Sequence, residues 1–111
     1  MYNFKLENFK FIIKGEPAFN RKPADLTVTE KKQACFYCEA VGVPLPAVEW
    51  YKDGVLLEKA DGIQIENKGK GINSLIIKSC SSDNVGTYTV KAKNDSGQIE
   101  CSFSLFIDSK I

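Results

Sequence analysis

The stretch ACFYCEAVGVPLPAVEWYKDG, residues 34–54, contains the strongest signals for the fold. Alternate residues over 33–41 fall on two faces, as expected of a β-strand with one side buried. The residues that would share the buried face are Ala34, Phe36, Cys38 and Ala40. The segment 42–46 is rich in glycine and proline and should end this strand. A second strand is expected around Trp50, and it should end in a turn at 52–54.

The rest of the chain repeats this succession of short strands and turns. Further strands are expected over 25–29, 63–66, 75–77, 88–93 and 99–107. Turns are expected at 68–71 and at 94–97, the second as a four-residue hairpin loop in which asparagine or glycine takes a positive φ. No segment shows the 3.6-residue period of an amphipathic helix. The pattern therefore predicts an all-β fold.

Length and composition fit one globular domain. The chain has 111 residues, of which 43% are hydrophobic and 26% are charged, and its formal net charge is +1. A domain of this size can bury a core of its own. The balanced charge gives no reason to expect a nucleic acid or an anionic membrane as partner. No apolar run approaches the roughly 20 residues of a membrane-spanning helix, and charges interrupt the first seven residues, so we expect no signal peptide.

The residue types that catalysis and metal binding need are scarce. The sequence contains no histidine, which removes the usual general base and the commonest metal ligand. Cys35 and Cys38 have the C-x-x-C spacing of many metal sites. In a strand, however, their side chains point to opposite faces and could not hold one ion. We therefore expect no enzymatic activity, no metal site and no cofactor.

Residues 1–16 differ from the remainder. Large apolar residues alternate along two short stretches that end before Pro17. This segment is either an N-terminal extension or linker from a preceding domain, or a strand that docks on an edge of the fold. An arm with so many large apolar side chains should find a surface to cover, so its phenylalanines are candidates for a partner surface: Phe4, Phe9 and Phe11. The domain itself is expected over 17–108, with 109–111 as a tail.

Four segments together carry a resemblance to a known family: 17–23, 38–54, 75–77 and 86–97. They resemble the I-set immunoglobulin domains of intracellular muscle proteins such as titin, twitchin, obscurin, myosin-binding protein C and myosin light chain kinase. The resemblance covers residues 17 to about 108. It implies an immunoglobulin-like sandwich of two sheets with Greek-key topology.

The resemblance also implies roles for individual residues. Trp50 would fill the space between the sheets and pack against Cys38. Tyr88 would be a tyrosine corner, with its hydroxyl bound to the backbone a few residues upstream. Position 84 is a departure, because asparagine stands where the family usually has aspartate, and this should weaken a charge-assisted contact in the preceding loop. The implied core consists of Cys38, Trp50, Leu75, Tyr88, Val90 and Leu105.

A second departure concerns the inter-sheet disulfide. Its second cysteine would stand at position 90, where this chain has valine. A bridge from Cys38 to that position would close about 52 residues and contribute about 4 kcal/mol, a gain that a secreted domain would rarely give up. The missing bridge therefore favours a reducing compartment. Counting along the predicted hairpin places Cys101 opposite Val90 and facing inward, so a Cys38–Cys101 bridge and free thiols both remain open; we favour free thiols.

One motif favours the opposite compartment. Asn94-Asp-Ser96 matches the acceptor pattern for N-glycosylation. Such triplets often arise by chance, and this one also suits a hairpin loop. The missing disulfide is therefore the stronger indication of the compartment.

A sandwich without reactive groups works through its faces, edges and ends. The resemblance implies a structural, protein-binding and monomeric module of a cytoplasmic scaffold protein in the sarcomere or cytoskeleton, in some members next to a kinase. Its partners would be proteins, such as actin or myosin filament components or neighbouring domains of the same chain. The alternative is an extracellular adhesion or receptor domain. Four lysines are candidates for contact with a partner, although a solvated face is the simpler explanation: Lys68, Lys70, Lys91 and Lys93.

Overall fold

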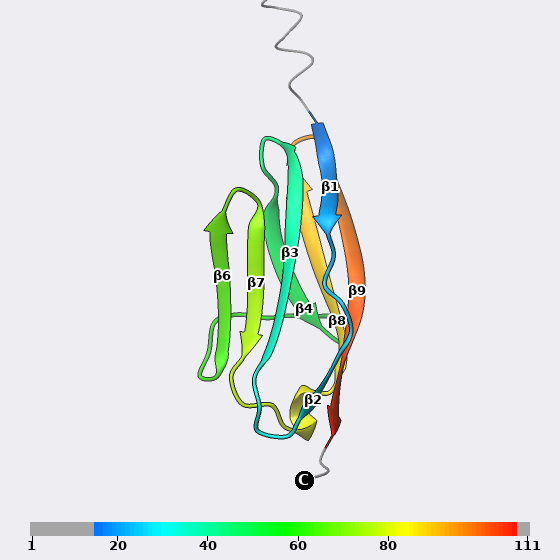
Figure 1. Ribbon diagram of the computed structural model, residues 1–111. Helices are drawn as coiled ribbons and strands as arrows, with labels where there is room; N and C mark the ends of the chain where they lie inside the picture. Colours follow the sequence, from blue (N-terminus) through cyan, green and yellow to red (C-terminus); the bar gives the residue numbers. More distant parts are fainter. Residues whose placement is uncertain (1–14, 109–111) are drawn as a thin grey trace, which may run out of the picture.

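The computed structural model describes residues 15–108, and the elements within this range are strands apart from one short 3-10 turn (Figure 1). They are β1 (Gly15–Arg21), β2 (Leu26–Thr29), β3 (Ala34–Val43), β4 (Ala47–Lys52), β5 (Val55–Leu56), β6 (Ile63–Gly69), β7 (Ile72–Ile77), η1 (Ser82–Asn84), β8 (Gly86–Asn94) and β9 (Gly97–Asp108). The predicted all-β fold is confirmed.

The strands form two sheets that pack face to face (Figure 1). One sheet has the order β1-β3-β7-β6 and the other β2-β9-β8-β4-β5. The pairs are antiparallel except for β2 with β9, which run parallel. Because β3 pairs with β7 and β4 pairs with β8, each sheet joins strands from distant parts of the sequence, as a Greek-key sandwich requires.

Strand β3 shows how the sequence pattern produces this packing. Its residues alternate between buried and exposed from Ala34 to Cys38, and the buried ones face the other sheet. The strand continues two residues beyond the predicted end at Val41, as far as Val43. Gly42 permits this continuation because its φ is 155°, and a Cβ there would lie 3.0 Å from the side-chain nitrogen of Asn94.

Residues 15–108 contain three hairpins, β4–β5, β6–β7 and β8–β9, and the turns of the first and the last differ from each other. The predicted turn at 52–54 is confirmed: Lys52 pairs with Val55, and Asp53 and Gly54 have φ values of 49° and 84°, as in the type I′ turns that join twisted strands tightly. The predicted four-residue loop at 94–97 is wrong, because Asn94 and Gly97 pair with each other and leave a two-residue connection. None of residues 94–97 has a positive φ. Instead the Asn94 carboxamide oxygen accepts a hydrogen bond from the Ser96 amide at 2.8 Å and stabilises the turn.

At the N-terminal end, β1 begins at Gly15, two residues before the domain start predicted at Pro17. Gly15 already pairs with Val43 of β3. Residues 1–14 and 109–111 lie outside the described residues, and so do the predicted extension and tail apart from Gly15 and Glu16. Whether the N-terminal segment is a linker or docks on the sandwich stays a prediction.

Candidate functional site

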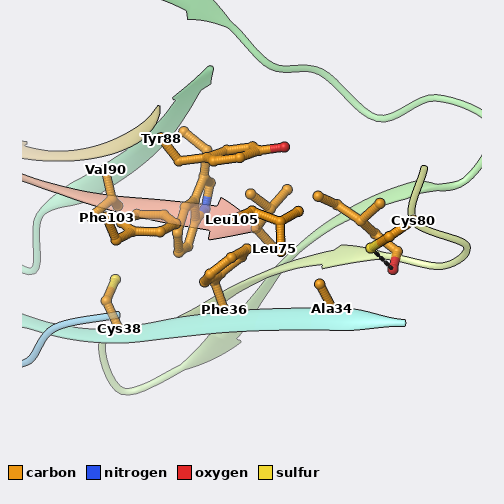
Figure 2. Packing of buried hydrophobic residues seen from close by; sticks show 11 residues of the cluster. Ala34, Phe36, Cys38, Leu75, Cys80, Tyr88, Val90, Phe103 and Leu105 are labelled. Atoms are coloured by element: carbon orange, nitrogen blue, oxygen red, sulfur yellow. Dashed lines mark hydrogen bonds between the residues drawn. The ribbon is translucent and has the colours of Figure 1, made fainter. Parts of the chain in front are cut away.

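The hydrophobic core lies between the two sheets and holds them together (Figure 2). Strands β3, β4, β7, β8 and β9 all contribute to it. The six residues predicted for the core are each at most 1% exposed: Cys38, Trp50, Leu75, Tyr88, Val90 and Leu105.

An aromatic cluster fills the middle of this core. The ring of Phe103 lies 4.6 Å from Phe36, 5.8 Å from Tyr88 and 5.9 Å from Trp50, measured between centroids. The Trp50 contact is edge-to-face at 83°, a favourable arrangement for aromatic pairs. Phe103 is not among the predicted core residues, yet it is buried and contacts three aromatic rings, of which Phe36 and Tyr88 are labelled beside it in Figure 2. The available signal was its spacing of two from Leu105, which places both on one face of β9.

The loop before β8 contains the tyrosine corner that the resemblance implied. The Tyr88 hydroxyl donates a hydrogen bond to the Asn84 carbonyl oxygen at 2.5 Å, and burial raises the pKa of this hydroxyl to about 12. The Asn84 side chain accepts a hydrogen bond from the Ser81 amide at 2.8 Å, and together with the Ser81 hydroxyl it forms a capping box. Asparagine therefore supplies the acceptor oxygen without a charge.

The four cysteines are all free. Cys35 is exposed on the outer face of β3, whereas Cys38 and Cys80 are buried and Cys101 is half-buried. Val90 lies opposite Cys101 in the β8–β9 ladder, as predicted. Burial raises the pKa of the Cys38 thiol to about 11, and the neighbouring Cys101 adds to the rise. Burial also raises the pKa of Cys80 and of Cys101, so the three inner thiols stay protonated near neutral pH and pack as small apolar groups.

Asn94 connects three parts of the sandwich. Its side-chain nitrogen donates hydrogen bonds to the carbonyl oxygens of Gly15, at 2.8 Å, and Pro44, at 2.9 Å. These bonds tie the β8–β9 hairpin to the start of β1 and to the corner after β3. The same nitrogen is the atom to which an N-linked glycan would be attached, and because the glycan replaces one of its two hydrogens, at least one of these hydrogen bonds would be lost.

Two of the predicted contact lysines lie on the outer face of the five-stranded sheet. Lys91 and Lys93 line a shallow hollow of about 350 Å³ together with Ala47, Glu49, Tyr51 and Gln98. The Lys91 ammonium lies 4.6 Å from the centre of the Tyr51 ring and 3.9 Å from a carboxylate oxygen of Glu100. Its charge is therefore partly satisfied within the domain. The hollow combines both signs of charge and would suit a polar protein surface.

The other predicted contact residues do not join this hollow. Lys68 and Lys70 lie at the end of β6 and in the β6–β7 turn of the opposite sheet. Lys68 is 3.9 Å from the carboxylate of Glu66, and both side chains are exposed. The predicted phenylalanines Phe4, Phe9 and Phe11 lie outside the described residues.

Within residues 15–108, no group of three or more cysteine, aspartate or glutamate side chains could hold a metal ion. In the same part of the chain, no helix has the length and apolar character to cross a membrane. What the described surface offers is strand edges, shallow hollows and exposed side chains, which suit contact with another polypeptide.

Comparison with known proteins agrees with this architecture. The model of the Immunoglobulin I-set domain matches residues 17–107. Mouse Myopalladin is 37% identical over 92 residues, which are 82% of this chain and 7% of that protein. The Muscle M-line assembly protein unc-89 of Caenorhabditis elegans is 40% identical over 81 residues, which are 73% of this chain and 1% of that protein. The chain thus spans less than a tenth of the length of these two relatives.

Solved structures show the same fold. The titin M3 domain is 30% identical, with a TM-score of 0.80, and the alignment covers 85% of this chain and 98% of that domain. The titin domains z1z2, solved in complex with telethonin, are 29% identical with a TM-score of 0.83 over 87% of this chain and 50% of that one. The family match extends over most of the chain and includes the core, the tyrosine corner and both sheets. The chain therefore belongs to the immunoglobulin I-set family.

Proposed function

We propose that this chain is a structural, protein-binding module of a muscle-type cytoskeletal scaffold protein and works in the cytoplasm without catalytic activity of its own. The relatives support the muscle setting, since one of them is named a muscle M-line assembly protein and the structural neighbours are titin domains. The titin z1z2 domains, solved with telethonin, support protein binding as the mode of action.

The observation that carries the cytoplasmic assignment is the unbridged core. Cys38 and Val90 are both fully buried at the position of the usual inter-sheet disulfide, and the sandwich closes around the aromatic cluster instead. A protein that relies on packing alone at this position is suited to a compartment that keeps thiols reduced. The hydrogen bonds of the Asn94 nitrogen also argue against the extracellular alternative.

The role can be tested by expressing residues 1–111 as a fluorescent fusion in striated muscle cells. We expect periodic bands that coincide with one part of the sarcomere. A diffuse signal equal to that of the fluorescent protein alone would contradict the proposal. A second fusion that lacks residues 1–14 but keeps β1 intact shows whether the sandwich alone is enough for the banding or whether the preceding segment is needed.

The compartment can be tested on purified protein by counting thiols without reductant. We expect four free thiols: Cys35 should react at once, Cys101 more slowly, and Cys38 and Cys80 only on unfolding, in the order of their exposure. A count of two on protein purified from its natural source would favour the extracellular alternative.

A further inference from the structure

The edge of β3 is only partly covered by its neighbour. Strand β1 pairs with β3 from Gly15 opposite Val43 to Arg21 opposite Glu39. The chain then leaves this sheet through residues 22–25 and joins the other sheet as β2, which pairs with β9. Strand β3 continues to Ala34, and in the described part of the chain no strand pairs with residues 34–38 on the β1 side.

No backbone hydrogen bond among the described residues connects the crossing segment 22–25 to this stretch of β3. Along a strand, alternate residues direct their amide and carbonyl groups to each side. The stretch therefore presents backbone donors and acceptors that no strand satisfies, which is the usual template for an added strand. Pro23 lies in the crossing segment and has no amide hydrogen to offer.

A hollow lies at this gap. Its volume is about 290 Å³, and the residues that line it include Arg21, Lys22, Pro23, Leu26, Cys35 and Tyr37. The Tyr37 side chain is 49% exposed on the outer face, beside the exposed Cys35. The hollow is thus bounded by the strand edge, by apolar and aromatic groups, and by two cationic side chains.

The two cations have no counterion within the described domain. Neither Arg21 nor Lys22 takes part in an ion pair among the described residues. Glu39 is opposite Arg21 in the β1–β3 ladder, but the two side chains form no such pair. Asp25 already accepts a hydrogen bond from the Ser104 amide at 2.8 Å. A guest with carboxylates would therefore meet two cationic side chains that form no ion pair among the described residues.

We propose that this gap binds an extended acidic peptide segment, which adds to β3 as a further strand along residues 34–38. The inference rests on the proposed function as a protein-binding module and names one of its contact surfaces. Backbone hydrogen bonds to β3 provide the affinity, and carboxylates of the guest that reach Arg21 and Lys22 provide the selectivity. Apolar side chains of the guest lie beside Tyr37 and Leu26.

The charge balance argues against the chain's own N-terminal segment as this guest. Residues 1–14 contain three lysines and one glutamate, so their side chains carry a net charge of 3 − 1 = +2. That sign is the same as that of the hollow. Residues 1–14 are therefore not the guest, which is an acidic segment outside them.

The test uses capped seven-residue peptides added to the ¹⁵N-labelled full chain and followed by NMR. The first peptide alternates glutamate with valine, the second replaces glutamate by lysine, and the third places proline at the centre of the first. We expect the acidic peptide to shift the backbone amide signals of residues 34–38 and of the non-proline residues in 22–26. The lysine peptide and the proline peptide should each bind with an affinity at least about tenfold lower.

Two charge-reversal variants provide the matched comparison. The double variant Arg21→Glu/Lys22→Glu should bind the acidic peptide with an affinity at least about tenfold lower than that of the parent chain. The double variant Lys59→Glu/Lys78→Glu makes the same change in net charge on side chains that line a different hollow, next to β6, and should bind like the parent chain. Unchanged folding of each variant is checked by the dispersion of its spectrum.

Each other outcome overturns the proposal. Equal binding of the acidic and lysine peptides would remove the role of Arg21 and Lys22, and shifts confined to β5 or β6 would place the guest on a different edge. Concentration-dependent shifts of residues 34–38 without peptide would show that a second copy of the chain occupies the gap. None of these results affects the banding expected in muscle cells, so the two proposals fail separately.

Discussion

Replacement of Val90 by cysteine tests how the two sheets face each other. Cys38 on β3 and Val90 on β8 are both 0% exposed and belong to one cluster (Figure 2). A bridge forms only if the two Cα atoms lie within about 7 Å. Closing the roughly 52 residues between these positions should add about 4 kcal/mol to the free energy of unfolding. The smaller cysteine side chain should cost about 1 kcal/mol, so a net gain of about 3 kcal/mol is expected for the oxidised form.

The assay is urea unfolding of the oxidised and the reduced variant, with the bridge located by mass spectrometry. Cys101 lies opposite position 90 and could compete for the new thiol. The experiment therefore uses Cys101→Ala as its background, and that single variant is the control. Reduced Val90→Cys should be about 1 kcal/mol less stable than this control, and oxidation should raise it well above the control.

Two results would refute the reasoning. If both thiols remain free under conditions that oxidise exposed cysteines, β3 and β8 do not face each other at this position. If the bridge forms but raises the free energy of unfolding by less than about 1 kcal/mol over the reduced form, the native packing resists the bridge. In either case the facing of β3 and β8 next to Trp50 described above would be wrong.

Three further predictions concern the same core. Trp50→Ala should lower the free energy of unfolding by about 3–5 kcal/mol in urea titrations, and a loss below about 1 kcal/mol would place the indole outside the core. Tyr88→Phe should cost about 1–2 kcal/mol, because the Asn84 carbonyl loses its hydroxyl donor; a loss below about 0.5 kcal/mol would show that this hydrogen bond contributes little and that the ring stabilises the corner by packing alone. The pKa of Cys38 is raised from 9.0 to about 11, so folding disfavours the thiolate. Stability should therefore fall as pH rises from 9 to 11, with a smaller fall in Cys38→Ala.

Much of the fold could be predicted from the sequence because its signals are local. Alternation along β3, the corner rich in glycine and proline, and the Asp53-Gly54 turn each restrict the backbone within a few residues. The tyrosine corner was implied by the resemblance to I-set domains, and Tyr88 and its acceptor Asn84 are four residues apart.

The features that escaped prediction depend on contacts between distant residues. The loop at 94–97 is shorter than predicted because the β8–β9 ladder extends to the pair of Asn94 and Gly97, and the sequence pattern also did not show that the Asn94 side chain bonds Gly15 and Pro44. The surroundings of Lys91 follow from the pairing of β4, β8 and β9, which places Tyr51 and Glu100 beside it. The gap beside β3 exists because β1 and β2 belong to different sheets, and a sequence pattern does not show which sheet a strand joins.

The parallel pairing of β2 with β9 determines how the domain would carry tension. In Figure 1 the described chain enters at the end where β1 begins and leaves at the opposite end with β9. Four residue pairs connect β2 to β9, from Leu26 with Leu105 to Thr29 with Asp108. A pull on the two ends would slide these strands lengthwise past each other, so the hydrogen bonds between them would be loaded together instead of opening one after another. Resistance to stretching would then depend on the barrier to breaking this ladder, a kinetic quantity, more than on the equilibrium stability of the aromatic core.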